Sequence, residues 1–190
     1  MKKLIFSFIL AASILSCSSD DNNSLTDANQ ISVNGSNYSI TDAKAVDNYN
    51  FFSETHAEFN FVLASAPIEV TATPGTVFGF TTDNAKFALN LSIAALGTTF
   101  QNGVYQYDEN FGFEEPNFNF FDGLTIYIDG NQDGQYSNPQ QDSVMFATGG
   151  TVTVSGTAPN YVLAFDVDMN NGQNLTFTYN QGFDYVDNRN

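Results

Sequence analysis

The chain has 190 residues, of which 21 are acidic and only five are basic, so its formal net charge is −16. So acidic a chain repels phosphate backbones, which excludes nucleic acid as a partner and favours cations such as calcium, although acidity also serves solubility. A single cysteine allows no internal disulfide, so the 19 Phe and nine Tyr must supply the large apolar surfaces of a core.

Residues 1–16 have the layout of a secretory signal peptide. A short positive end (residues 1–3) precedes an apolar run (residues 4–15), and the small residue Ser16 stands directly before Cys17. The apolar run is too short for a comfortable membrane span, and no other stretch of the chain approaches spanning length. The sequence therefore predicts export of the chain.

The end of this segment, Ile14-Leu15-Ser16-Cys17, resembles the lipobox of bacterial lipoproteins. In that family the peptide is cut before the cysteine, which then carries acyl chains such as palmitate. The resemblance implies a lipidated Cys17, and several chains on one residue give effectively permanent attachment. The Ser-Asp-Asp run that follows is similar to the export signal of Bacteroidota surface lipoproteins. It implies the outer membrane of a Gram-negative bacterium as the location, with an outward-facing domain expected and a periplasm-facing domain as the alternative.

Residues 17–29 lack any periodicity and predict a flexible tether. From Gln30 the pattern changes to short alternating runs, which predict a single domain over residues 30–190. The first two runs, 31–33 and 38–40, flank Asn34-Gly35, a favoured dipeptide for a tight hairpin turn. Further strands are expected within residues 59–63, 87–93, 104–107 and 124–128.

The last third of the chain predicts an antiparallel meander. Runs at 152–154, 161–167 and 175–179 are separated by short turn segments, and a final run at 183–186 could add one strand. Many short strands without a helical stripe indicate an all-β fold, either an antiparallel β-sandwich or a β-barrel. Both alternatives alternate inward apolar with outward polar residues, so the pattern does not choose between them.

The segment from Asp129 to Gln135 has the spacing of the first half of a calcium loop. Side-chain oxygens of Asp129, Asn131 and Asp133, a carbonyl at Gln135, and a glycine at the sixth place fit one Ca²⁺ ion. The twelfth place lacks the glutamate of an EF-hand, and Asp142 could substitute for it. The affinity expected of such an extracellular loop is roughly 0.1 to 1 mM. A plain hairpin turn is the alternative, since Asp, Asn and Gly are ordinary turn residues.

An aromatic stretch and several tyrosines are the candidates for ligand contacts. Phe118 and Phe120 are expected in the core, whereas Phe111 and Phe113 are the expected exposed members of this stretch, available to a ligand. Tyr136, just after the calcium loop, is the third candidate contact. Three other tyrosines are equally open to roles as stacking platforms or rim residues: Tyr105, Tyr107 and Tyr127.

No catalytic signature is evident. His56 is the only histidine and lies near a serine and acidic residues, but no nucleophile elbow accompanies it, so a structural role is expected. The leading hypothesis is a non-catalytic binding or accessory protein, with a glycan, a small molecule or a protein as ligand. A structural or adhesion protein is the alternative. A polysaccharide hydrolase comes third, and its carboxylates would come from Asp108, Glu109, Glu114 and Glu115.

Overall fold

The computed structural model describes residues 29–49, 53–71, 78–109, 116–136, 138 and 140–189. Within these ranges the regular elements are thirteen β-strands, and the all-β prediction is confirmed. No helix in the described part of the chain is long and apolar enough to cross a membrane. Cys17, most of the predicted tether, Phe111 and Phe113 lie outside the described residues.

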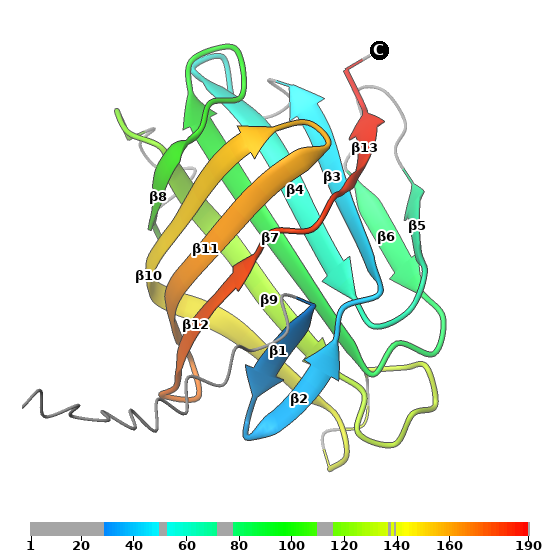
Figure 1. Cartoon of the computed structure of the whole chain (residues 1–190). Helices are drawn as coiled ribbons and strands as arrows, with labels where there is room; N and C mark the ends of the chain where they lie inside the picture. Colours follow the sequence, from blue (N-terminus) through cyan, green and yellow to red (C-terminus); the bar gives the residue numbers. More distant parts are fainter. Residues whose placement is uncertain are drawn as a thin grey trace, which may run out of the picture.

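The strands form one large sheet and two hairpins (Figure 1). The hairpins are β1 (Gln30–Val33) with β2 (Ser36–Ser39), and β5 (Ile68–Thr71) with β6 (Gly79–Thr82). The sheet strands are β3 (Asp42–Tyr49), β4 (His56–Ala64), β7 (Phe87–Leu96), β8 (Gly103–Tyr107), β9 (Phe120–Ile128), β10 (Ser143–Thr157), β11 (Asn160–Met169), β12 (Asn174–Tyr179) and β13 (Asp184–Asp187).

The large sheet is curled into a half-barrel (Figure 1). Its nine strands follow the order β12-β11-β10-β8-β9-β7-β4-β3-β13, and β10 also pairs with β9. The pairings of β8 with β9 and of β13 with β3 are parallel, and the others in the sheet are antiparallel. The sheet is therefore mixed, because two of its neighbouring strand pairs run in the same direction.

The hairpin turn at Asn34-Gly35 forms as the dipeptide predicts. Both residues have positive φ angles, 53° and 76°, and Val33 pairs with Ser36. A two-residue turn of this kind matches the twist of the flanking strands. Ile31 and Val33 are buried within the main core, so this small hairpin caps one end of the curled sheet. The meander of β10, β11 and β12 is also present as predicted.

The link from β12 to β13 spans the gap between the two edge strands of the curled sheet. β12 forms one edge, and β13 pairs with β3 at the other. Between them the link 180–183 crosses the opening of the curl, and the side chain of Phe183 is only 3% exposed. Its ring lies 5.2 Å from that of Phe61 and 5.0 Å from that of Tyr179. The predicted last run thus adds a strand, but at the edge opposite the meander.

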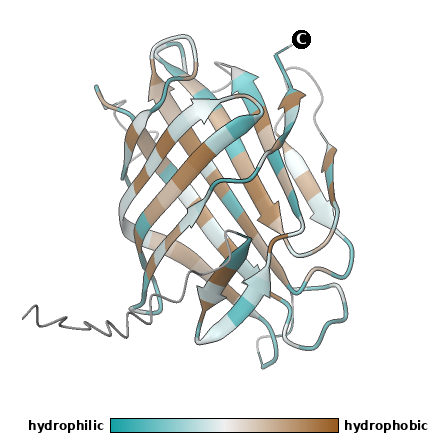
Figure 2. Ribbon diagram, viewed as in Figure 1, coloured by the Kyte–Doolittle hydropathy of each residue, from teal (hydrophilic) through white to brown (hydrophobic). Residues whose placement is uncertain are grey.

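Aromatic side chains fill the interior of the curl. Phe59 packs against Phe100 at 4.5 Å between ring centroids, and Phe61 meets Tyr161 edge to face at 5.5 Å. Tyr105 is fully buried and donates its hydroxyl hydrogen to the carbonyl of Gln101. Because inward residues alternate with outward ones, the strands appear striped when coloured by hydropathy (Figure 2). A side-chain-filled interior is usual for a small barrel.

A second, smaller apolar cluster lies on the outer face of the sheet. Val62, Ala64 and Ala88 point outward from β4 and β7, and Ile68 of β5 covers them. Phe80 of β6 and Tyr127 of β9 are among the partly buried side chains packed against this cluster. The β5–β6 hairpin therefore covers only part of the outer face. It leaves partly exposed aromatic side chains along its border with β9.

Candidate functional site

The predicted calcium loop connects β9 to β10. Ser143 pairs with Ile128 at the end of the ladder, so continuation of the register places Asp129 and Asp142 opposite each other at the base of the loop. Tyr127 and Val144, the preceding outward pair, lie on the outer face, and strand alternation returns the two aspartates to that face. Asp129 is 3% exposed and Asp142 is 8% exposed. Two carboxylates are thus buried at the mouth of one loop.

Asp129 organises the first turn of the loop. Its Oδ1 accepts hydrogen bonds from the backbone N–H groups of Gln132 (2.5 Å) and Asp133 (3.3 Å), and its Oδ2 accepts one from Gly134 (2.8 Å). Gln132 and Gly134 have φ angles of 60° and 79°. Glycine adopts the positive φ at the sixth place of the motif without strain, as the sequence pattern predicts. Each carboxylate oxygen has two lone pairs, so these contacts leave Asp129 able to bind a cation.

Asn131 and Asp133 lie together at the tip of the loop. The Asn131 amide donates to Asp133 Oδ2 at 2.9 Å, and the Asp133 N–H donates to Asn131 Oδ1 at 3.1 Å. The N–H of Gln135 donates to Asp133 Oδ1 at 2.9 Å. These local contacts are the ones that Asn and Asp make in ordinary turns as well. They bring three of the predicted ligands together without distinguishing a metal loop from a hairpin turn.

Asp142 has one oxygen that lacks a partner. Its Oδ2 accepts a hydrogen bond from the N–H of Asn138 at 2.7 Å, whereas the buried Oδ1 has no hydrogen-bond partner in the described structure. The ion pairs found among the described residues involve Lys44 or Arg189, and none reaches this loop. A buried carboxylate oxygen without a partner calls for an ion or a water.

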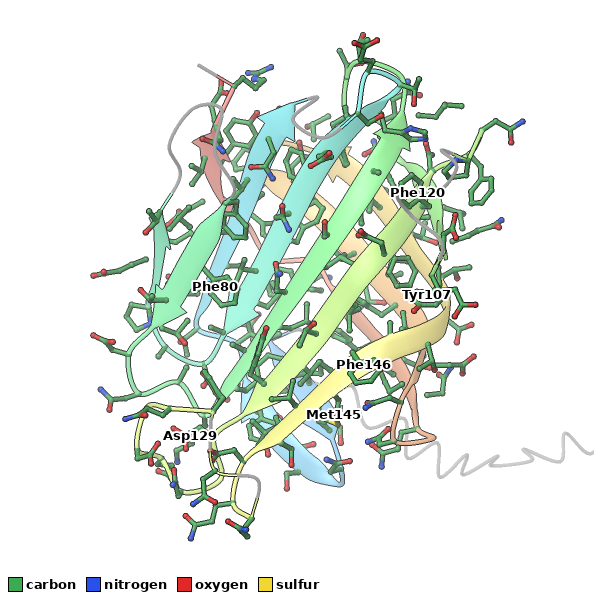
Figure 3. The ribbon with its side chains drawn as sticks, turned by 180° about the vertical axis from the view of Figure 1, so that it is seen from behind. Phe80, Tyr107, Phe120, Asp129, Met145 and Phe146 are labelled. Atoms are coloured by element: carbon green, nitrogen blue, oxygen red, sulfur yellow. The ribbon has the colours of Figure 1, made fainter. Side chains whose placement is uncertain are left out.

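The loop does not hold three converging acidic side chains. No group of three or more His, Cys, Asp or Glu residues in the described ranges is arranged to hold a metal ion. Asp129 and Asp142 form one pair at the base, while Asp133 lies at the tip with Asn131. Any cation held here would therefore need amide or backbone oxygens in addition to carboxylates, which is usual for calcium. Figure 3 shows where Asp129 lies at the end of β9.

Tyr136 follows the predicted calcium ligands in the same loop and packs against the end of β6 and the β6–β7 connection. Its hydroxyl donates to the carbonyl of Ala85 at 3.2 Å and lies 3.2 Å from the hydroxyl of Thr82. Burial raises the pKa of the Tyr136 phenol, the Thr82 contact lowers it, and the carboxylates of Asp129 and Asp142 raise it further. The phenol is therefore close to both buried aspartates.

Tyr136 lines two surface pockets. One, of about 420 Å³, is aromatic on three sides, where Tyr127 contacts Phe80 at 6.4 Å and Tyr136 at 5.3 Å between ring centroids. The rest of its lining comes from Thr81, Thr82, Asp83 and Gly134. We name this pocket the aromatic cradle. Tyr136 is predicted from the sequence to contact a ligand. Tyr127 is left open there as a stacking platform or a rim residue, and Phe80 is not predicted to belong to the site.

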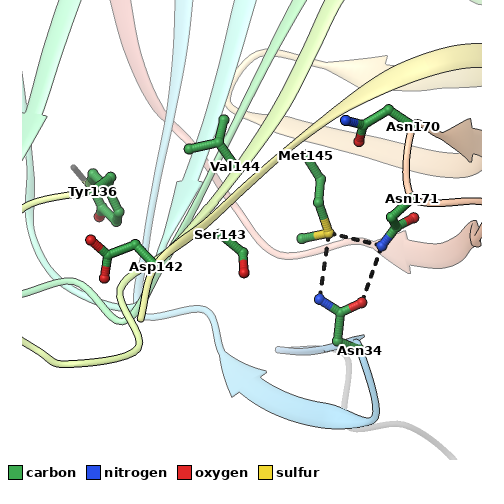
Figure 4. Close-up of a pocket in the computed structure, with 8 residues that line it drawn as sticks. All are labelled: Asn34, Tyr136, Asp142, Ser143, Val144, Met145, Asn170 and Asn171. Carbon is green, nitrogen blue, oxygen red and sulfur yellow. Dashed lines mark hydrogen bonds between the residues drawn. The ribbon is translucent and has the colours of Figure 1, made fainter. Parts of the chain in front are cut away.

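The second pocket, of about 490 Å³, is more polar (Figure 4). Its lining includes Met145, whose sulfur accepts contacts from the amides of Asn34 at 3.6 Å and Asn171 at 3.1 Å. The Asn171 amide also donates to Asn34 Oδ1 at 3.1 Å. This polar pocket therefore joins the β1–β2 turn to the β11–β12 turn, and it is separated from the aromatic cradle by Tyr136.

Exposed apolar side chains extend the aromatic cradle along β10. Val144, the register partner of Tyr127, is 46% exposed, and Phe146 is 52% exposed. The alternate residues of β10, Met145 and Ala147, point into the core. In Figure 3, which looks onto this outer face, Phe80 and Phe146 lie on opposite sides of β7 and β9. An exposed apolar strip of this kind is a common feature of binding surfaces.

His56 has a structural environment. Its side chain is fully buried, packs edge to face on Phe120 at 5.1 Å, and uses both ring nitrogens. Nδ1 lies 2.8 Å from the Thr55 hydroxyl, and Nε2 lies 3.3 Å from the carbonyl of Phe118. Phe120 is buried as expected, but Phe118 is 39% exposed, which contradicts the expectation that it belongs to the core.

The carboxylates considered for glycoside hydrolysis are only partly described. Asp108 and Glu109 lie near Tyr107, whose pKa they raise in addition to the larger effect of burial. Glu114 and Glu115 lie outside the described residues. Comparisons of the chain with protein-family models, with curated proteins and with solved structures give no match.

Proposed function

We propose that the chain is a lipid-anchored, non-catalytic binding or accessory protein of a Gram-negative outer membrane, facing the cell exterior. Its ligand site is the surface around Tyr136. The observation that carries the binding role is the aromatic cradle, which continues into the exposed Val144 and Phe146 on the same face. A concave, largely aromatic site with a few polar groups is what ligand pockets commonly offer.

Calcium stiffens the neighbouring loop in this proposal. The proposed ligands are the five that the sequence predicts, Asp129, Asn131, Asp133, Gln135 and Asp142. Because Asp133 lies at the tip and does not converge with the two aspartates at the base, binding of the ion would have to draw the tip towards the base. The unpartnered Oδ1 of Asp142 supports calcium binding, because a cation would balance two buried carboxylates for which the described residues provide no ion pair, although Lys86 is a backbone neighbour of Asp129. An ordered loop would add support to Tyr136, which Ala85 and Thr82 already hold and which forms one wall of the cradle.

A non-catalytic role is supported by the environment of the sole histidine. His56 is fully buried with both nitrogens engaged, and Ser53 Oγ accepts hydrogen bonds from the N–H groups of Thr55 and His56, both at 3.0 Å. These contacts shape the turn before β4. A nucleophile and its general base need a direct hydrogen bond between their side chains, and Ser53 Oγ is engaged instead by these N–H groups and by the Thr55 hydroxyl at 3.2 Å. The Thr55 hydroxyl does contact the His56 ring, at 2.8 Å, and in this proposal that contact fixes the buried ring within the turn.

Thermal unfolding of the full chain with 10 mM calcium and with chelator tests the metal. A dissociation constant of 0.1 to 1 mM corresponds to a stabilisation of about 1.4 to 2.7 kcal/mol, or a Tm increase of roughly 3 to 11 °C. Asp142→Asn removes one charge at the base and should abolish the increase. Asp166→Asn, at an exposed position of β11, is the matched control and should retain the increase. No increase in the wild type would reduce the loop to a hairpin turn.

Membrane attachment is tested separately by cell fractionation and by incorporation of labelled palmitate. Wild-type protein is expected in the outer-membrane fraction, labelled and sensitive to external protease. Cys17→Ser should remove the label and release the protein from the membrane. A Cys17→Ser protein that stays in the outer membrane would contradict lipid anchoring, whatever the calcium result.

A further inference from the structure

The aromatic cradle has the shape of a three-sided receptor for a compact ligand. Tyr127 forms its floor, since its ring contacts that of Phe80 on one side and that of Tyr136 on the other, with interplanar angles of 67° and 48°. The three residues come from β9, β6 and the β9–β10 loop, so no single element forms the site. The pocket is open to solvent on one side, and its volume of about 420 Å³ is sufficient for a small molecule.

The rings are held in place before any ligand binds. The Tyr136 hydroxyl is fixed by Ala85 and Thr82, both at 3.2 Å. Phe80 stacks on Phe78 at 6.0 Å and packs with Tyr127 on the outer apolar cluster. A ligand would therefore lose little free energy to the ordering of side chains, which is the advantage of a preorganised site.

The charge around the cradle is predominantly acidic, although Lys86 lies next to Ala85 and accepts the N–H of Asp129 with its carbonyl at 3.1 Å. Asp83 lines it, and the buried Asp129 and Asp142 lie close to the Tyr136 hydroxyl. Lys86 is the only basic residue between positions 78 and 142, and it does not line the cradle. With a net charge of −16 on the whole chain, the site repels anions and attracts cations.

Aromatic faces and acidic charge together recognise a particular chemistry. The face of an aromatic ring carries negative potential and attracts a cation within about 6 Å of its centre, most strongly when the cation is poorly hydrated. A metal ion gains little from aromatic faces, because it requires oxygen ligands. An alkylated ammonium group matches both features, since its methyl groups fill an apolar space while its charge meets the ring faces.

We propose that the aromatic cradle binds an organic cation of the quaternary ammonium class, with Phe80, Tyr127 and Tyr136 around the methylated nitrogen and Asp83 at the rim. This inference rests on the proposed binding function and names its ligand class. The proposed ligand is the free cation in solution, because the cradle is a surface pocket of about 420 Å³ and choline carries the whole recognised group without a lipid chain.

The probes are choline and 3,3-dimethyl-1-butanol, which have the same shape but differ in the charged nitrogen. Each is titrated by calorimetry into the full chain in a maltoside detergent, which carries no cation to compete. Choline is expected to bind at least ten times more tightly than the neutral probe. Tyr127→Leu should weaken choline binding at least tenfold, and Asp83→Asn should weaken it several-fold with the fold intact.

Phe146→Leu is the matched control, because Phe146 is exposed on the same face but does not line the cradle, and choline binding should be unchanged. If Tyr127→Leu fails to fold, Phe80→Leu takes its place. Equal binding of the two probes would overturn the cation class while leaving a binding site at the cradle. No binding of choline to folded protein would overturn this inference, and the calcium and anchoring experiments would stand on their own results.

Discussion

Phe183→Ala tests whether the link between β12 and β13 closes the half-barrel. The Phe183 ring is 3% exposed and lies 5.2 Å from Phe61, 5.0 Å from Tyr179 and 6.3 Å from Tyr161. These neighbours belong to β4, β12 and β11, whose positions are fixed by their ladders, so the space left by the ring cannot collapse fully. We expect a loss of about 3 to 5 kcal/mol in the free energy of unfolding.

For a domain of this size the loss corresponds to a decrease in Tm of roughly 6 to 20 °C. Urea unfolding of the full chain, followed by circular dichroism, measures the loss in the free energy of unfolding, and thermal unfolding measures the decrease in Tm. Phe183→Leu keeps most of the apolar volume and should lose only about 1 to 2 kcal/mol. Phe146→Ala removes a ring that is 52% exposed and should change stability by less than about 0.5 kcal/mol. If Phe183→Ala cost no more than Phe146→Ala, the link would not seal the interior and the closure argument would be wrong.

Two further predictions concern the meander and the tyrosines. Gly150 and Gly172 have φ angles of 95° and 80°, but a Cβ on Gly150 would lie 2.2 Å from the carbonyl oxygen of Asp166, whereas one on Gly172 would meet nothing within 4 Å. In urea unfolding, Gly172→Ala should cost about 1 to 2 kcal/mol and Gly150→Ala distinctly more, and equal costs would contradict the close approach of β10 to β11. Burial, and to a lesser degree the Asp42 carboxylate, raise the pKa of Tyr179 to about 12, so the folded state favours the neutral phenol. Its contribution is complete below pH 10 and is lost as the pH rises from 10 towards 12. Phenolate absorbance at 295 nm should then rise together with loss of the circular dichroism signal, and complete titration near pH 10 in a folded protein would refute this.

Features that depend on neighbouring residues could be predicted from the sequence. Asn34-Gly35 predicts its hairpin turn because the required positive φ angles are local properties of those two residues. Alternation in 161–167 and 175–179 predicts β11 and β12 because one face of each strand is buried in the same core. Such signals survive because tertiary contacts reinforce the local preference.

The first half of β10 shows where a local signal misleads. Thr148-Gly149-Gly150 resembles a turn, yet the strand continues from Ser143 to Thr157. A register shift between Ala147 and Gly149 lets the strand change its partner from β9 to β8, and glycine permits the irregular backbone there. The glycines that predict the end of a strand therefore form a bulge within a continuous strand. Only the pairing with the neighbouring strands distinguishes a bulge from a turn.

The candidate site depends on pairings that no local pattern contains. Tyr136 and the aspartates of the loop are predictable because they lie close together in sequence, but Phe80 joins them only because the β5–β6 hairpin folds over the outer face of β4 and β7. The sequence does contain a signal for Tyr127, the floor of the cradle. In the strand that ends at Ile128, Tyr127 occupies an outward position where alternation predicts a polar residue. Phe146 breaks the same rule on β10, where it is 52% exposed. An aromatic residue on the outer face of a strand costs solubility unless something covers it. Phe80 and Tyr136 pack against Tyr127, whereas Phe146 stays exposed, and this exposure supports the binding surface proposed above.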